Sequence, residues 1–230
     1  NEFQARVAGW SYAEIAAGGG GIMSTVRMTR SVSRQQLMLV AHQRLNAMLD
    51  YGITTVEAKS GYGLTTVDEL RLLELYRELN RSHDVDVLAT FMGAHTIPLE
   101  HREDPGAYMD LVVEEMLPQV AERGLAHYCD VFCEPGFFDL EQSRRVLDKA
   151  RELGMQLLIH ADQLQQAGGA ELAAELGVLG ASHLDHVDED GITKRVLRQN
   201  EDTSMPQFVR FPVAGREDWL RVRARLNPDD

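Results

Sequence analysis

The chain has 230 residues, of which 44% are hydrophobic and 26% charged, and its formal net charge at pH 7 is -13. This composition predicts one soluble globular domain with a full hydrophobic core, and the acidic balance argues against nucleic acid or an anionic membrane surface as a partner. No apolar run approaches the roughly 20 residues of a membrane span and no secretory signal opens the chain, so we expect a cytoplasmic enzyme.

The chain opens with a polar segment and a helical turn, which a run of four glycines follows at residues 18–21. A phosphate-binding loop would need a preceding strand and a following Lys-Ser/Thr, and neither is present. We therefore interpret the run as a flexible turn, followed by a loop, IMSTVRMTRSVS, that leads to a helix start at Ser33.

Beyond Ser33, helical and strand-like segments alternate along the chain. The apolar residues of the helical segments recur at helical spacing, and the strand segments are β-branched or apolar runs. The predicted helices are 34–50, 66–82, about 108–123, 140–153 and 167–176, and the predicted strands are 53–59, 85–94, 127–133, 156–161 and 178–184. Such alternation is typical of a parallel sheet covered by helices.

Five strands leave two architectures open. A closed (β/α)₈ barrel needs eight strands and typically about 250 residues. An open doubly wound sheet suits five strands, but the glycine fingerprint of a nucleotide site does not follow the first strand. After about residue 193 the alternation stops, because the remaining sequence contains prolines, clustered arginines and a final charged helix but no further buried strand.

Three of the predicted strands end in a histidine, namely His95, His160 and His183. A single histidine at a strand end is more often structural, but α/β proteins keep their chemistry at the carboxyl ends of parallel strands, so three in one register favour a site. His160, within QLLIHADQ, is the first candidate for a catalytic or metal-binding residue. The other histidines are weaker candidates: His186 is ambiguous, and His42, His83, His101 and His127 are interpreted as structural or exposed.

The chain has two cysteines, Cys129 and Cys133, in one predicted strand. Their spacing places them about 13 Å apart on one face, which is too far for a disulfide, and the partners of a zinc knuckle are missing. We expect two buried thiols in a protein of a reducing compartment.

Five motifs in order carry a family resemblance: EAKSGYGL at 57–64, FMGAHTIP at 91–98, IHADQ at 159–163, GGAELA at 168–173 and ASHLD at 181–185. Together they strongly resemble imidazolonepropionases, metal-dependent hydrolases of the amidohydrolase superfamily that act in histidine degradation. The opening segment EFQARVAGWSYAEIAAGGGGIMSTV is also similar to that family. A single motif such as GAH would be weak, whereas five in register over about residues 1–192 are specific.

The resemblance implies a (β/α)₈ TIM barrel of the metal-dependent hydrolase type, here incomplete because the first strand and the last strands are missing. Residues 1–192 would form the partial amidohydrolase barrel, and residues 193–230 a divergent C-terminal tail that is not clearly part of it. The implied reaction is hydrolysis of 4-imidazolone-5-propanoate to N-formimidoyl-L-glutamate, with one zinc or iron ion per subunit and a possible homodimer. The alternative is a catalytically inactive fragment that lacks its metal site.

The resemblance also implies roles for five side chains. His160 matches a metal ligand, and Tyr62 and His95 match residues that bind the substrate. Gln163 matches a catalytic and substrate-binding position held by Glu or Gln, and His183 matches a catalytic histidine near the metal-bound water. We expect all five to share one pocket, with His160 and His183 closest together. The residue types suit a reaction in which a metal activates water and neutral imidazoles handle protons.

The sequence also departs from the family pattern. The His-x-His metal pair, the metal-ligand Asp with its Asn-Pro-Gly turn, and the Arg that binds the substrate carboxylate are not seen. Only His160 remains of the expected ligands, so the metal site is expected to be incomplete and the chain inactive by itself. Asp162 has two equally favoured interpretations, which are orienting its neighbours or capping a turn.

Overall fold

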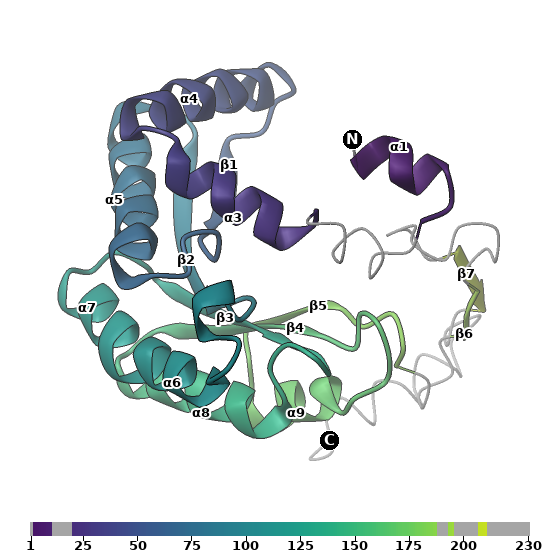
Figure 1. The fold of residues 1–230 in the computed structure, drawn as a ribbon. Coiled ribbons are helices and arrows are strands. Elements are labelled where there is room, and N and C mark those ends of the chain that lie inside the picture. Colours follow the sequence, from purple (N-terminus) through teal and green to yellow (C-terminus); the bar gives the residue numbers. More distant parts are fainter. Residues whose placement is uncertain (1, 11–19, 188–192, 196–206, 211–230) are drawn as a thin grey trace, which may run out of the picture.

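The computed structural model describes residues 2–10, 20–187, 193–195 and 207–210. Its central element is a parallel sheet in which five strands lie in chain order. The strands are β1 (Thr55–Lys59), β2 (Asp86–Ala94), β3 (Tyr128–Cys133), β4 (Gln156–Ala161) and β5 (Gly180–His183). The strand order and direction confirm the prediction, and Figure 1 shows the sheet curled with helices along its convex side, so the fold is an α/β half-barrel.

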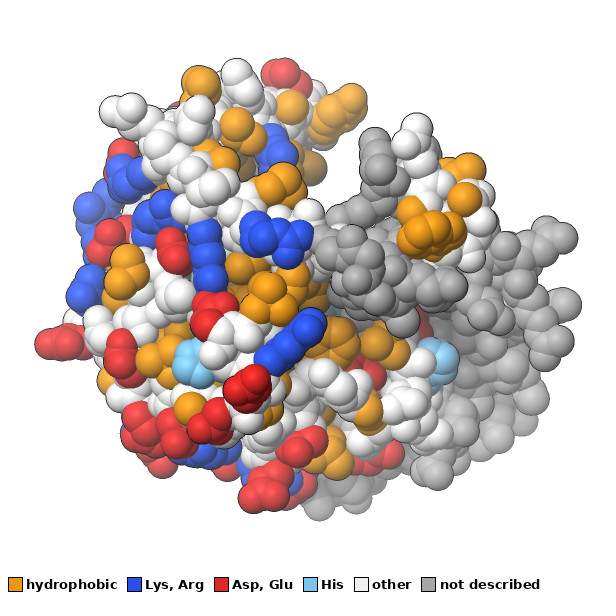
Figure 2. Space-filling model, viewed as in Figure 1, with side chains coloured by type: hydrophobic (Ala, Val, Ile, Leu, Met, Phe, Trp, Pro, Cys, Tyr) orange, Lys and Arg blue, Asp and Glu red, His pale blue; other side chains and the backbone are white. Residues whose placement is uncertain are grey.

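The helices alternate with these strands. They are α4 (Arg34–Asp50), α5 (Thr66–Ser82), α8 (Leu140–Glu152) and α9 (Gly169–Leu176), and a composite run of η1 (Leu99–His101), α6 (Pro105–Asp110), the π-helix η2 (Leu111–Met116) and α7 (Leu117–Glu122) joins β2 to β3. Helix α4 starts where the sequence predicts because Ser33 and Gln36 form a capping box. Figure 2 shows acidic and basic side chains intermixed over the helices on this face of the molecule.

The hydrophobic core lies between the convex face of the sheet and the helices. Successive residues of a strand point to opposite faces, and the buried members of β2, β3 and β4 that join this core alternate with residues of the concave face. These buried residues include Ala89, Phe91, Cys129, Val131, Leu157 and Ile159. Cys129 and Cys133 are buried, free thiols, as predicted. The concave face instead carries polar residues such as Thr90, Asp130 and His160.

The loop predicted for residues 22–33 is wrong, because Ile22–Ser31 form helix α3. Its Ser, Thr and β-branched residues give it low intrinsic helix propensity, which is why the sequence suggested a loop. Tertiary contacts stabilise it: Val26 is fully buried in the main core, and the Arg71 guanidinium donates to the Thr29 carbonyl at 2.8 Å. A short helix, α1 (Glu2–Val7), precedes it.

Beyond β5, the described residues add no strand to the five-stranded sheet. Strands β6 (Thr193–Arg195) and β7 (Gln207–Arg210) pair with each other in a separate antiparallel sheet, which the sequence analysis did not predict. The predicted final helix lies outside the described residues, and the division of the chain at residue 193 stays a prediction. Within the described part of the chain, no helix has the length and apolar character needed to cross a bilayer.

Candidate active site

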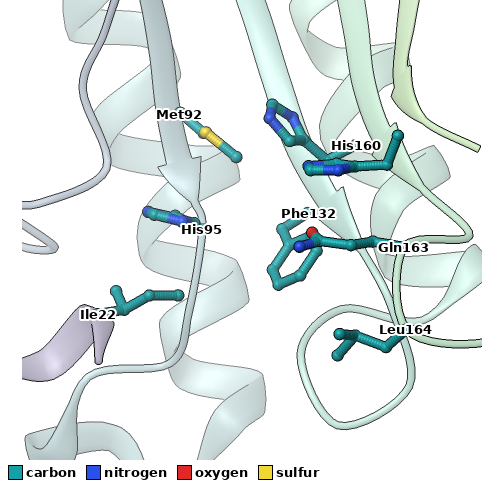
Figure 3. Close-up of a pocket in the computed structure, with 8 residues that line it drawn as sticks. Ile22, Met92, His95, Phe132, His160, Gln163 and Leu164 are labelled. Carbon is teal, nitrogen blue, oxygen red and sulfur yellow. The ribbon is translucent and has the colours of Figure 1, made fainter. Parts of the chain in front are cut away.

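A cavity of about 250 Å³ opens at the carboxyl ends of strands β2 to β5. Its lining residues are Ile22, Met92, His95, Phe132, His160, Gln163, Leu164 and His183. Figure 3 shows Met92 and His95 on one side of it, facing Phe132, His160 and Gln163 on the other. Four of the five predicted site residues therefore come together from three different strand ends, those of β2, β4 and β5.

Tyr62, the fifth predicted residue, does not line this cavity. Its ring meets His95 edge-on, with ring centroids 5.0 Å apart. It lines a second cavity of about 400 Å³ between β1, α4 and α5, where Met48 is another lining residue. The prediction that His160 and His183 are the closest pair is wrong. Their ring centroids are 5.2 Å apart, whereas those of Tyr62 and His95 are 5.0 Å apart. The prediction of one shared pocket holds for four residues, and Tyr62 lies behind His95.

The loop that carries Tyr62 is organised around a carboxylate that the sequence analysis missed. Glu69, in the first turn of α5, is fully buried and accepts hydrogen bonds from the backbone N–H groups of Gly61, Gly63 and Leu64 at 2.9, 2.7 and 2.8 Å. Gly61 has φ +90°, and a Cβ there would lie 2.5 Å from the carbonyl oxygen of Met92, so only glycine fits. This arrangement fixes the backbone on both sides of Tyr62.

His95 is oriented by the same loop. Its Nδ1 lies 2.9 Å from the carbonyl oxygen of Gly61. A carbonyl oxygen only accepts hydrogen bonds, so Nδ1 carries the proton and Nε2 of the neutral ring keeps its lone pair. Burial lowers the pKa of His95, the hydrogen bond to Gly61 opposes this shift, and the nearby His160 adds to it.

We expect the ring of His95 to titrate below its ordinary pKa of 6.5. Because the histidine protonates more readily in the unfolded chain, its contribution to the free energy of unfolding is fully present above the unfolded pKa and is lost as the pH falls through the lower folded pKa. NMR titration of the histidine rings, with His95→Gln used to assign the resonance, measures the midpoint. A midpoint at or above 6.5 would contradict the role given to burial.

His160 is held by Asp130, a second carboxylate that the sequence analysis missed. Nδ1 of His160 lies 3.0 Å from Asp130, whose other neighbour is the Lys59 ammonium at 2.7 Å. The Asp130 side chain is only 1% exposed. Burial raises the pKa of its carboxyl, but the hydrogen bond to His160 and the charges of His160 and Lys59 outweigh burial, so the pKa lies below its ordinary value.

His183 ends β5 on the other side of His160. Burial lowers its pKa, and the proximity of His160 lowers it further, while the Asp185 carboxylate, 3.7 Å from Nδ1, opposes the shift. His183 has φ +74°, a conformation that a non-glycine residue rarely adopts. At neutral pH a histidine with a lowered pKa is uncharged and can accept a proton.

Two buried carboxylates shape the loop that carries Gln163. Asp162 accepts from the N–H groups of Ala167 and Ala170, both at 2.7 Å, so of its two interpretations the structure shows the capping role. Glu134 accepts from the N–H groups of Gln163 and Leu164. The side chain of Gln163 is thus presented to the cavity by a backbone that is fixed from both sides.

The fit of these residues to a metal ion is partial. His160 offers only Nε2, because its Nδ1 is bonded to Asp130. Across residues 2–10, 20–187, 193–195 and 207–210, no three His, Cys, Asp or Glu side chains are grouped to hold a metal. A catalytic zinc site normally has three protein ligands, so the described residues do not complete such a site.

A curled parallel sheet with histidines at its strand ends defines an α/β barrel-type protein. Its sequence is homologous to curated proteins named imidazolonepropionase, which confirms the resemblance. The one from Alkaliphilus metalliredigens is 52% identical over 194 residues, covering 84% of this chain and 46% of that protein. The one from Thermoanaerobacter pseudethanolicus is 50% identical over 192 residues (84% and 46%), and the one from Clostridium tetani is 49% identical over 226 residues (98% and 53%).

The chain spans about half the length of the curated relatives it matches. No family model matches it. Among solved structures, a dipeptide epimerase from Methylococcus capsulatus aligns over 72% of this chain and 58% of its own, with 12% identity and a TM-score of 0.25, a likeness too weak to support an inference.

Proposed function

We propose that this chain forms the part of an imidazolonepropionase that binds and positions 4-imidazolone-5-propanoate for hydrolysis to N-formimidoyl-L-glutamate. The observation that carries the proposal is the convergence of His95, His160, Gln163 and His183 on one cavity. These residues lie within the motifs that carry the resemblance, and about half of the aligned positions are identical to those of the relatives. The barrel would be of the metal-dependent hydrolase type.

The cavity suits a small polar ring. Its volume of about 250 Å³ is slightly below the range of roughly 300–1,000 Å³ that is usual for sites that enclose a drug-sized ligand. Met92 and Phe132 supply apolar walls, and the Gln163 amide can both donate to and accept from the ring amide.

His183 and His95 then have different roles in proton transfer and substrate binding. His183 is uncharged at neutral pH and half-open to solvent, so it takes the role of proton acceptor from the attacking water. His95, with its proton on Nδ1, offers the Nε2 lone pair to a donor group of the substrate. The Tyr62 ring packs edge-on against the His95 ring and helps to orient it.

The metal in this proposal is inferred only from the resemblance to the family. One zinc or iron ion per subunit would polarise the ring carbonyl and lower the pKa of water, and of the described residues His160 would be its ligand. We also propose that the chain binds a small-molecule substrate and pairs with a second copy in a homodimer. Neither nucleic acid nor a membrane is a proposed partner, and the proposed location is the cytoplasm.

A chimera tests the proposal. The segment of the Alkaliphilus metalliredigens imidazolonepropionase that this chain matches is replaced by this chain's own sequence, and hydrolysis of 4-imidazolone-5-propanoate is measured. We expect the chimera to be active and the 230-residue chain alone to be inactive. A chimera that folds but does not turn over the substrate would contradict the proposal and support the alternative of an inactive fragment.

A further inference from the structure

The concave face of the sheet carries a continuous line of hydrogen-bonded polar side chains that crosses four adjacent strands. Thr90 donates to Glu57 at 2.5 Å, and Lys59 donates to Glu57 at 2.6 Å and to Asp130 at 2.7 Å. Asp130 in turn meets Nδ1 of His160 at 3.0 Å. The line therefore runs from β1 to β3 and β4, with Thr90 of β2 as a branch on Glu57, and it ends on a ring that lines the cavity.

The chemistry at the end of this line constrains where His160 carries its proton. An ionised carboxylate only accepts hydrogen bonds, so Nδ1 must donate and the lone pair of the neutral ring must be on Nε2. A neutral histidine without such a partner prefers the opposite arrangement, with its proton on Nε2. The hydrogen bond made by one ring nitrogen thus decides what the other can do.

Asp130 has donors on two sides. Its side chain is 1% exposed, whereas that of Lys59 is 27% exposed, so the ion pair reaches from the interior to solvent. The Lys59 ammonium and Nδ1 of His160 approach the same carboxyl group at 2.7 and 3.0 Å. An ammonium group can only donate, so the carboxylate acts as the acceptor for both neighbours.

We propose that Asp130 is the positioning residue that keeps the proton of His160 on Nδ1 and directs the Nε2 lone pair at the cavity. This inference concerns the site of the proposed function, and the importance of the His160 proton for catalysis rests on that function. Its test reads the position of a proton on one ring and needs no turnover. A failed activity assay and a failed inference are therefore distinguishable.

The test is ¹⁵N NMR of the histidine rings in the 230-residue chain at a pH where the rings are neutral. In the native sequence, Nδ1 of His160 should have the shift of a protonated nitrogen and Nε2 that of an unprotonated one. In Asp130→Asn, whose amide can turn to donate instead, the two shifts should move toward each other as the Nε2–H form becomes populated. The proposal is overturned if His160 in Asp130→Asn keeps the native pair of shifts.

His95 is an internal control in the same spectra. Its Nδ1 donates to a backbone carbonyl, which Asp130→Asn does not alter, so its shifts should stay unchanged. Equal movement of His95 and His160 would overturn the proposal, because it would show a general loosening of the site.

Lys59→Met is a second variant that keeps the carboxylate, in case Asp130→Asn does not fold. It should leave the proton of His160 on Nδ1 at this pH. If Lys59→Met redistributes the proton although Asp130 is present, the carboxylate does not set the tautomer and the proposal fails.

Discussion

Replacing His160 by alanine in the chimera should lower kcat/KM for 4-imidazolone-5-propanoate by more than about 100-fold, because His160 is the proposed metal ligand and loss of the groups that merely support such ligands already costs roughly 10- to 100-fold. The ring lines the cavity between His183 and Phe132, and it is the donor that Asp130 accepts from. Its loss removes the Nε2 lone pair from the site and leaves a buried carboxylate with one partner fewer. Steady-state kinetics of the purified chimera measure the effect.

The matched control is His127→Ala. His127 precedes β3 at the opposite end of the sheet from the cavity, and its side chain is exposed. This substitution also removes one imidazole, but it should leave kcat/KM within the error of the assay. Equal losses in both variants would mean that the first effect reflects a damaged fold and not a missing site residue.

The second large effect is on stability, at Glu69. Glu69→Ala leaves the N–H groups of Gly61, Gly63 and Leu64 buried without an acceptor. Each such orphaned group costs about 1–3 kcal/mol, so the sum is at least about 3 kcal/mol out of a typical total of about 5–15 kcal/mol. We expect a large fall in the urea midpoint, followed by circular dichroism, or loss of cooperative unfolding.

Glu78→Ala on the same helix is the comparison. Glu78 forms an exposed ion pair with Arg34, and such surface pairs contribute about 0–1 kcal/mol. Its urea midpoint should therefore stay near that of the native chain. If the two variants unfold at the same urea concentration, the three hydrogen bonds to Glu69 do not stabilise the loop as inferred.

The regular elements were predictable because their signals are local. The helices at 34–50 and 66–82 and the strand at 156–161 have the predicted bounds, since apolar spacing and capping residues such as Ser33 lie within each segment. The histidines at strand ends were predictable for a related reason: parallel strands in sequential order bring their carboxyl ends to one edge. Helix α3 was missed because the contacts that stabilise it, such as that with Arg71, are distant in sequence.

The residues that hold the site in place were not predictable in the same way. Asp130 pairs with Lys59 across 71 positions of sequence and with His160 across 30. One signal was present, because Asp130 interrupts an otherwise apolar strand in YCDVFC, and a charge is rarely buried without a partner. Glu69 gave no such signal, since a glutamate in the first turn of a helix is ordinary on a surface.

The most direct test of the central claim, that the histidine-lined cavity receives the imidazolone ring, is NMR of ¹³C-methyl-labelled methionines during a titration with 4-imidazolone-5-propanoate. Met92 lines this cavity and Met48 lines the neighbouring cavity beside α4. The account predicts a saturable shift of the Met92 methyl resonance with no change at Met48. A response at Met48 alone, or no response at Met92 up to saturating ligand, would contradict it.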